Sequence, residues 1–399
     1  MLIRSVLAIV TLLFTLQSTQ AQTPEEKGND RRKKSARSVE DLSKEPETIT
    51  EINLSRRRLT EFPKEVFLCK NATELNLSGN GFTQIPEDIA LMKNLRKLII
   101  KDNKLTTIPS GIASLSELEI LDISGNQLTN LPALGSLKKL SKLFISNNQL
   151  KSIPADLSSL TELEELDISN NQLSALPNFK AFSKLTSLSC NKSGLTELPA
   201  GISGLTELKT LSVSNNNLTG LPKEIGALTK LTNLNLSGNK ISSIPAEVIS
   251  MKALNQLDFS ENSLTKLPAE LFKIATLQTL NVSSNSIQQI PNEIPDSCSI
   301  IQLNLSENKL TTVPATLWNC KSLTNLMLSN NALKTLPNGV SALKRLTSID
   351  ISDNELESLP IKELASMQQV RNFRFMNTKQ KETPKSPEAI KPLPNDNKK

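Results

Sequence analysis

The chain lacks the side chains that most enzymes use to move protons or to hold metals. Its 399 residues include no histidine and no tyrosine, and aromatic residues make up only 3% of the composition. Histidine titrates nearest neutral pH and is the commonest metal ligand, so its absence removes the usual general base and the usual metal site. The scarcity of aromatic residues means that any large core must be aliphatic.

Other signatures of catalysis are also missing. The patterns GxSxG and GxxxxGK[ST], which position a nucleophilic serine or a phosphate group, do not occur. A cysteine nucleophile would lack a histidine partner. We therefore predict that the protein is not an enzyme and that it binds no cofactor and no metal.

Long apolar runs are absent except at the amino terminus. There, Arg4 precedes an apolar run over residues 6–16, and small residues follow up to Ala21. A run of this length is too short to span a bilayer, and the arrangement is typical of an export signal over residues 1–21. We expect cleavage after Ala21, with an uncleaved anchor as the alternative. No cysteine near the cleavage point could take a lipid, so we predict a secreted or periplasmic protein without a membrane span.

The dominant feature of the sequence is the phrase LxxLxLxxNxLxxLP, which occurs fourteen times between Ile49 and Pro360. Successive copies begin 22 or 23 residues apart, and a degraded fifteenth start at Val370 keeps Phe373 and Phe375. A fixed period of this length indicates stacked units, each too small to bury its apolar side alone. The copies begin at Ile49, Ala72, Leu95, Leu118, Leu140, Leu163, Leu185, Leu208, Leu231, Leu254, Leu277, Ile300, Leu323 and Leu346.

The spacing within a copy predicts its local structure. In the copy that begins at Leu231, Leu234 and Leu236 alternate with polar residues, which is the two-residue period of a strand. Proline stands at the fourteenth offset of every copy, where its fixed φ and missing donor suit a turn. Apolar residues then recur every three positions, which predicts one or two helical turns on the outer side.

Asparagine stands at the eighth offset of twelve copies, from Asn80 to Asn354, and the two exceptions are Arg57 and Ser193. A buried amide at a tight bend can donate to and accept from backbone groups that would otherwise be unpaired. We expect its hydrogen bonds to reach the backbone of its own unit and of the next one. The pattern therefore predicts a structural asparagine ladder.

Together these features resemble the leucine-rich repeat family, specifically the 23-residue class of scribble-type and adenylate-cyclase-type proteins. The resemblance covers residues 49–376. It implies an α/β fold, a right-handed horseshoe-shaped solenoid with a parallel sheet on its concave side and short helical turns on its convex side. It also implies binding of other proteins without identifying a partner. The usual members of this class are cytoplasmic, and the export signal is a departure from them.

The segments that flank the repeats differ in composition. Residues 22–48 hold seven basic and seven acidic side chains with few apolar ones, and residues 377–399 hold four prolines and six lysines. Both segments are predicted to be disordered, although residues 39–42 could cover part of the first unit. The net charge is +6, of which the repeats carry about +2, so the dense basic stripe of a nucleic-acid-binding protein is not expected.

The four cysteines and the eight N-x-[ST] triplets are largely products of the repeat. Cys69, Cys190 and Cys320 occupy core positions, which predicts buried thiols. Cys298 lies one place off the core position in the unit beside Cys320, and adjacent units are about 4.8 Å apart, so a Cys298–Cys320 disulfide is possible but not required. Five triplets recur at the same strand offsets, so the repeat itself generates them, and we expect that they carry no glycan. Trp318, on the outer segment, is expected to shield the core.

One neighbourhood breaks the polar pattern of the concave positions, which are offsets two, four, six and seven. Most of these positions hold Ser, Asn, Gln, Asp or Thr. Apolar residues surrounded by charge are typical of an interaction site, so we predict that this neighbourhood contacts a protein partner. The predicted site consists of Ile99, Ile120 and Phe144 with Lys97, Lys101 and Lys142.

The sequence leaves two classes of function open. The first is an exported scaffold or adhesin that presents its concave sheet to a protein or to a surface polysaccharide. The second is a structural component of the envelope without a dedicated ligand. The apolar neighbourhood favours the first, whereas the uniformly polar concave positions from Ser212 to Asn304 are what the second predicts.

Overall fold

The computed structural model describes residues 34–376. The predicted export signal and the predicted disordered tail lie outside the described residues. The described residues from Ser35 onward belong to one compact unit. Within residues 34–376, every helix is too short or too polar to span a bilayer.

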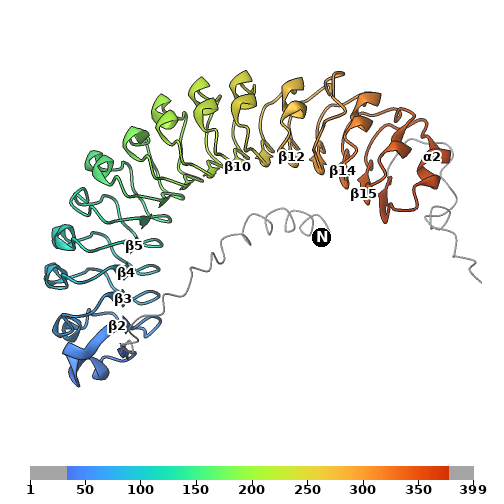
Figure 1. The fold of residues 1–399 in the computed structure, drawn as a ribbon. Coiled ribbons are helices and arrows are strands. Elements are labelled where there is room, and N and C mark those ends of the chain that lie inside the picture. The colour runs from blue at the N-terminus through green and yellow to red at the C-terminus, as the bar shows by residue number, and fades with distance from the viewer. Residues whose placement is uncertain (1–33, 377–399) are drawn as a thin grey trace, which may run out of the picture. The chain divides into compact units, whose positions relative to one another are not determined.

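The repeats form one sheet in which the strands follow each other in sequence order, along the inner side of an arc (Figure 1). We call each repeat a coil, from coil 1 at Ile49 to coil 14 at Leu346. The strands are β1 (Lys34–Ala36), β2 (Ile49–Asn53), β3 (Glu74–Asn76), β4 (Lys97–Ile99), β5 (Ile120–Asp122), β6 (Lys142–Phe144), β7 (Glu165–Asp167), β8 (Ser187–Ser189), β9 (Thr210–Ser212), β10 (Asn233–Asn235), β11 (Gln256–Asp258), β12 (Thr279–Asn281), β13 (Gln302–Asn304), β14 (Asn325–Met327), β15 (Ser348–Asp350) and β16 (Asn372–Arg374).

The register of the sheet matches equivalent positions of successive repeats. Leu234 of β10 pairs with Leu211 of β9 and with Leu257 of β11, and the strands are parallel. The predicted parallel sheet with one strand for each repeat is therefore confirmed. Strict matching also means that each offset forms a straight row of side chains across the coils.

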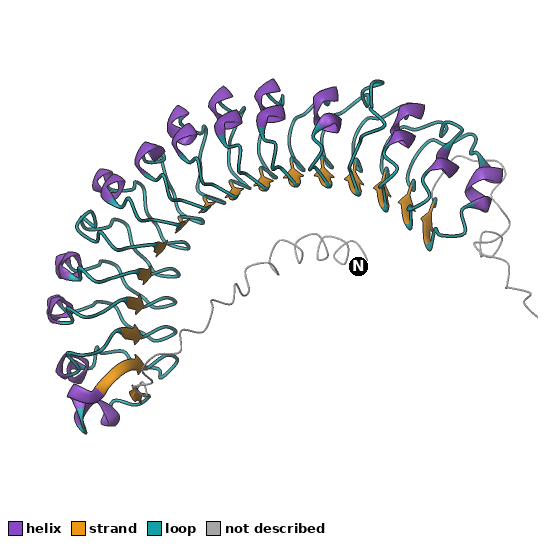
Figure 2. Cartoon of the chain, in the orientation of Figure 1, coloured by secondary structure: helices purple, strands orange, loops and turns teal. Residues whose placement is uncertain are grey.

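The outer side carries short helices, most of which begin directly after the repeated proline (Figure 2). The predicted helical turns are confirmed, but coils 4 and 11 lack them. The helices are η3 (Lys64–Leu68), η4 (Glu87–Leu91), η5 (Ser110–Ser114), η6 (Ala155–Ser159), η7 (Phe179–Ala181), η8 (Ala200–Gly204), η9 (Lys223–Ala227), η10 (Ala246–Ser250), η11 (Ala269–Lys273), η12 (Ala315–Asn319), η13 (Val340–Ala342) and α2 (Ile361–Ser366), all 3₁₀-helices except α2.

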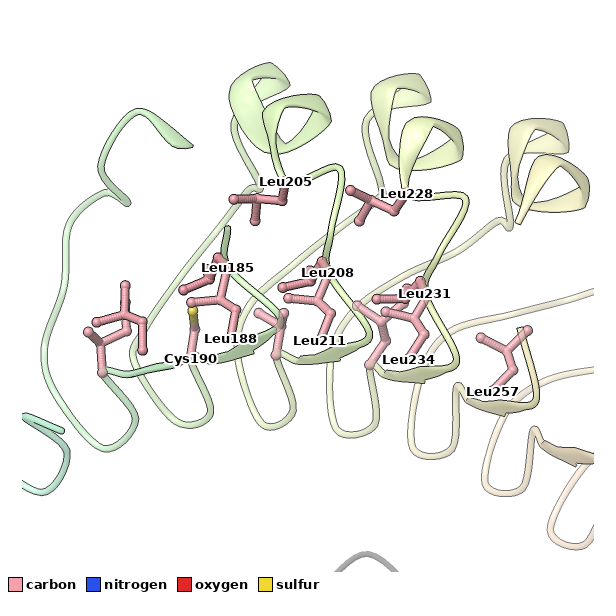
Figure 3. Packing of buried hydrophobic residues seen from close by; sticks show 14 of the residues in the cluster. Leu185, Leu188, Cys190, Leu205, Leu208, Leu211, Leu228, Leu231, Leu234 and Leu257 are labelled. Carbon is pink, nitrogen blue, oxygen red and sulfur yellow. The ribbon is translucent and has the colours of Figure 1, made fainter. Parts of the chain in front are cut away.

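The core is a continuous aliphatic layer between the strands and the outer helices. Leu208, Leu211 and Leu234 are fully buried, and Figure 3 shows the equivalent leucines of neighbouring coils stacked in the same orientation. Removing apolar surface from water favours folding by about 25 cal/mol for each Å². Since each coil has one open apolar face on either side, stability requires that coils stack.

The asparagine ladder is present in all twelve coils that carry the residue. In coil 9, the Asn239 Nδ2 donates to the carbonyl oxygens of Leu236 and Val213, at 2.9 and 3.0 Å, and its Oδ1 accepts from the Leu218 N–H at 3.0 Å. The prediction that the amide reaches the next coil is wrong, because Val213 and Leu218 belong to the preceding coil. The side chain points back along the solenoid, so each coil is joined to the one before it.

The amino-terminal flank is ordered where we predicted disorder. Of the predicted leader over residues 22–48, residues 34–48 form β1, η1 (Glu40–Ser43) and η2 (Pro46–Thr48), while residues 22–33 lie outside the described residues. Leu42 is fully buried, and its carbonyl oxygen accepts a hydrogen bond from the Cys69 Sγ of coil 1 at 3.7 Å. Burying the apolar end of coil 1 explains the order, and the expected cover over residues 39–42 is present.

Three cysteines are buried at the predicted core positions, but Cys320 is not the free thiol that its position predicted. Cys298 and Cys320 form the disulfide that the sequence left open, with Cα atoms 4.8 Å apart, and it joins the helix-free coil 11 to coil 12. Cys69 and Cys190 are buried free thiols, and burial raises the pKa of Cys69 to about 11. Trp318 is buried on the outer side, where its Nε1 donates to the Asn338 carbonyl oxygen at 3.1 Å.

Candidate functional site on the concave face

The concave face consists of rows of side chains at offsets two and four of each strand. Across β3 to β7, the register aligns two such rows. They combine three apolar side chains with charged residues, whereas Met327 of β14 is the one apolar residue at these two offsets in the other coils. The offset-two row reads Glu74, Lys97, Ile120, Lys142 and Glu165, and the offset-four row reads Asn76, Ile99, Asp122, Phe144 and Asp167.

The structure brings the predicted site residues together on three adjacent strands. Lys97 and Ile99 lie on β4, Ile120 lies on β5, and Lys142 and Phe144 lie on β6, so the site spans about 10 Å across the sheet. The sixth residue, Lys101, follows β4 at the start of the bend. We call these six residues the concave site.

The apolar residues of the concave site alternate with polar ones. In the register, Asp122 lies between Ile99 and Phe144, and Ile120 lies between Lys97 and Lys142. The site is thus a mosaic of apolar and charged side chains on adjacent strands. None of the three apolar side chains is fully buried, so each retains surface that a partner could cover.

Two of the three lysines are neutralised within the sheet. The Lys97 Nζ lies 3.8 Å from the Glu74 Oε2, and the Lys142 Nζ lies 2.6 Å from the Glu165 Oε1. Both pairs point away from Ile120, because their acids lie on the outer strands β3 and β7. The charge around the apolar residues therefore includes two ion pairs with the flanking strands. The matching offsets of Glu74 and Glu165 in neighbouring copies were the signal in the sequence.

A serine after the strand fixes the side chain at offset four. The Asp122 Oδ1 accepts from the Ser124 N–H and Oγ, at 3.1 and 2.6 Å. Asn235 accepts from Ser237 in the same way. This local hydrogen-bonded turn explains why N-x-S recurs in the sequence, and it gives the five recurring triplets a structural role.

The concave face changes character from β8 onward. Its offset-two row becomes neutral, and the Asn233 Nδ2 donates to the Gln256 Oε1 of the next strand at 2.8 Å. The row continues without a charge over Ser187, Thr210, Asn233, Gln256, Thr279 and Gln302.

Asp258 is an acid that the neutral part of the face buries deeply. Its side chain is 6% exposed, accepts from the Ser260 N–H and Oγ, and accepts from the Asn281 Nδ2 at 3.2 Å. Burial raises the pKa of Asp258, and the hydrogen bonds partly offset that rise. Its hydrogen-bonding capacity is directed to the protein's own groups.

Two exposed leucines on the convex side were missed from the sequence. Leu68 and Leu91 are 53% and 54% exposed at the last positions of η3 and η4. The signal was available, since the two leucines occupy the same offset of adjacent copies, where the other 23-residue copies have Ser, Gly, Ala, Lys, Asp or Asn. Among residues 34–376, no cluster of His, Cys, Asp or Glu has the composition of a metal site.

Family models and solved structures agree with this architecture. A leucine-rich repeat protein of Leptospira interrogans has a similar structure, with 29% identity, a TM-score of 0.79, and coverage of 90% of this chain and 97% of that one. No curated protein sequence matches the chain. A model for leucine-rich repeats matches residues 70–128, 93–150, 183–241, 229–287 and 275–333, and a model for two such repeats matches residues 138–181.

Two further structures show the same fold in proteins of other origin. The ectodomain of the plant receptor kinase GASSHO1/SCHENGEN3 from Arabidopsis thaliana, in complex with Casparian strip integrity factor 2, is 26% identical, with a TM-score of 0.63 over 83% of this chain and 44% of that one. YopM from Yersinia enterocolitica is 27% identical, with a TM-score of 0.65 over 84% of this chain and 66% of that one. With models that match well over half of its residues, the chain belongs to the leucine-rich repeat family.

Proposed function

We propose that the protein is an exported, non-enzymatic scaffold that binds a protein partner through its concave site. The partner would cover Ile99, Ile120 and Phe144. It would meet the exposed charge of Lys101, with Lys97 and Lys142 at the rim in their ion pairs with glutamates. Binding energy at protein interfaces concentrates in a few apolar or aromatic residues that a polar rim surrounds. The concave site has this composition on three rigid, adjacent strands.

The observation that carries the proposal is the presence of these three apolar residues at concave offsets where other coils are mostly polar. They do not contribute to the buried core, whose positions are filled by other residues of the same strands, such as Leu98 and Leu143. Replacing them therefore changes the surface without opening a cavity. A function in binding gives them a role that stability does not.

Two of the structural relatives support a protein ligand and a bacterial origin. The Arabidopsis ectodomain was solved in complex with Casparian strip integrity factor 2, and the Leptospira protein matches this chain over nearly its whole length. Export is proposed from residues 1–21, and cell fractionation tests it. Recovery of the protein in the secreted or periplasmic fraction is expected, and its recovery in the cytoplasm would contradict export.

The test of the concave site is a triple alanine variant, Ile99→Ala with Ile120→Ala and Phe144→Ala. Affinity capture from the cell envelope with the wild-type protein supplies the partner, and calorimetry measures its affinity. We expect the variant to bind at least ~100-fold more weakly, since two or more anchors at roughly 2 kcal/mol each are lost.

The matched control has the same pattern of offsets on β8 to β10. It combines Ser189→Ala, Thr210→Ala and Asn235→Ala, and it should bind the partner like the wild type. Unchanged affinity in the first triple variant, with a native circular dichroism spectrum, would remove the concave site from the proposal. Capture of a polysaccharide in place of a protein would change the class of ligand.

The alternative function is a structural envelope component without a dedicated ligand. The offset-two row over β8 to β13 favours it, because that row has no charged and no apolar side chain for a partner to contact. The capture experiment separates the two functions: a specific envelope protein retained by wild type and lost by the concave triple supports the scaffold. Retention of no component at all supports the structural role.

A further inference from the structure

The bends that follow the strands carry charge of opposite sign at the two ends of the solenoid. Each bend comprises offsets six to nine. In coils 1 to 3, these bends hold five basic residues and one acid, Asp102. In coils 10 to 14 they hold four acids, Glu261, Glu307, Asp353 and Glu355, and one lysine. We call the five basic residues the basic bend cluster, and they are Arg56, Arg57, Arg58, Lys101 and Lys104.

The basic bend cluster is exposed and forms no ion pair with the described part of the chain. All five residues are exposed, and none of them joins an ion pair within residues 34–376. Other lysines of the solenoid behave differently, as where Lys139 and Lys184 each lie 2.6 Å from a glutamate of the preceding coil. The cluster therefore does not serve to hold the coils together.

Coil 2 places two glycines between the basic residues. The Arg56 N–H donates to the Ser78 carbonyl oxygen at 2.8 Å, and the Gly79 N–H donates to the Lys101 carbonyl oxygen at 2.9 Å. A Cβ on Gly79 would lie 2.9 Å from the Arg56 Cγ, so the missing side chain lets Arg56 lie against coil 2. Coils 1 and 3 are about 10 Å apart, so about three residues of an extended peptide would span the distance between their basic residues.

The bend of coil 1 has an unusual backbone. Every coil has a left-handed residue at offset seven, but Arg58 adds a second at offset nine, with φ of 59°. The other coil with this second left-handed residue is coil 7, where it is Gly194. These are the two coils without the ladder asparagine, since Arg57 and Ser193 replace it. Coil 1 thus has arginine at a left-handed position where coil 7 has glycine, which adopts this backbone without strain. Strained backbone of this kind is concentrated at functional sites.

We propose that the basic bend cluster binds an acidic segment, rich in glutamate or aspartate, of the protein partner. The inference rests on the proposed function and extends it, because Lys101 belongs to both the cluster and the concave site. A guanidinium group forms two parallel hydrogen bonds with a carboxylate, so the three arginines of the cluster favour a carboxylate-rich ligand. Nucleic acid is disfavoured, because stacking aromatic side chains are missing from these bends.

A fluorescent octaglutamate peptide tests the cluster without knowledge of the natural partner. Its binding to the full chain is followed by fluorescence anisotropy at low salt, with octalysine as the peptide control. The variant Arg57→Glu with Lys104→Glu should bind at least ~10-fold more weakly, because a charge-assisted hydrogen bond is worth about 1.5 kcal/mol or more. The control Lys223→Glu with Lys252→Glu changes two exposed convex lysines and should bind like the wild type.

Three outcomes would overturn the inference. The first is that the charge-reversal and control variants bind octaglutamate equally well. The second is that the wild type binds octaglutamate and octalysine equally well. The third is that a sulfated polysaccharide displaces the labelled octaglutamate at a lower concentration than unlabelled octaglutamate does. The concave triple alanine variant should retain octaglutamate binding while it loses the natural partner. A capture experiment that retains no partner therefore counts against the proposed function, whereas octaglutamate binding by the basic bend cluster is judged separately.

Arg58 supplies a second readout. The variant Arg58→Gly relieves the left-handed arginine, so its melting temperature should rise. If the side chain binds the acidic segment, octaglutamate affinity should fall in the same variant. A higher melting temperature with unchanged affinity would exclude Arg58 from the cluster and assign it a purely structural position.

Discussion

The concave face has two parts that share one scaffold but differ in surface chemistry. On β3 to β7, apolar and charged side chains alternate, and ion pairs such as Lys142–Glu165 connect neighbouring strands. On β8 to β13, the offset-two row is neutral and the one acid at offset four, Asp258, is buried. The core is continuous through both parts, and every coil of the two parts except coil 7 carries the ladder asparagine. The comparison indicates that the repeat maintains the fold while the residues at offsets two and four vary independently of it.

The largest expected effect tests whether the scaffold is equivalent in both parts. Asn126 and Asn239 make the same three kinds of backbone hydrogen bond and are equally buried at 8% exposure. Asn126→Ala and Asn239→Ala should each lower the free energy of unfolding by about 3 to 6 kcal/mol, since buried backbone groups lose their partners. Urea denaturation measures the two losses.

Equal losses would support a shared scaffold, and Asn217→Ala, which replaces an exposed asparagine beside the ladder, serves as a control with little effect. A loss at Asn239 that greatly exceeds the loss at Asn126 would break the comparison. It would mean that the neutral part depends on its ladder more than the mosaic part does.

A smaller effect concerns the buried acid of the neutral part. The pKa of Asp258 is raised by burial from 3.8, so the native state binds more protons than the unfolded state at pH just above that value. Stability from this group therefore falls as the pH rises through this window. Asp258→Asn removes the charge, and we expect it to be more stable than the wild type at neutral pH.

The advantage of Asp258→Asn should shrink as the pH is lowered toward 4, which denaturation at a series of pH values would measure. Asp122→Asn, at the same offset of the mosaic part, is the matched control, because Asp122 is only partly buried. An advantage that grows toward low pH would contradict the account of Asp258.

The smallest effect is expected for the ion pair that borders the concave site. Lys142→Gln with Glu165→Gln should change the free energy of unfolding by less than about 1 kcal/mol, because both side chains are 36% exposed and water screens such pairs. A double-mutant cycle measures the coupling. A coupling of several kcal/mol would show that these charges serve stability, which would weaken their assignment to recognition.

The regular part of the fold follows from the sequence because hydrophobic periodicity determines it. The strand recurs in each copy, and the outer turn and the ladder asparagine recur in most copies. An atypical residue in one copy therefore does not obscure the pattern. The order of residues 34–48 was not predictable in the same way. Ala36 and Leu42 are isolated apolar residues in a charged segment, and their burial depends on the exposed end of coil 1.

The site was predictable in position but not in electrostatics. Ile99, Ile120 and Phe144 are apolar at offsets where most copies are polar. The alternation of buried and exposed offsets along each strand places them on the concave face. The pairing of Lys97 with Glu74 depends on the side-chain direction of both residues, which offsets alone do not fix. The disulfide was left open for a similar reason, since spacing allowed it but only the path of the helix-free coil 11 brings Cys298 to Cys320.

The most direct test of the central claim is amide hydrogen exchange of the full chain with and without the captured partner. The account predicts added protection in β4, β5 and β6 and in the bends that follow them, with β9 to β12 unchanged. Added protection confined to β9 to β12, or to the outer helices, would contradict a division of the concave face into a binding part and a neutral part.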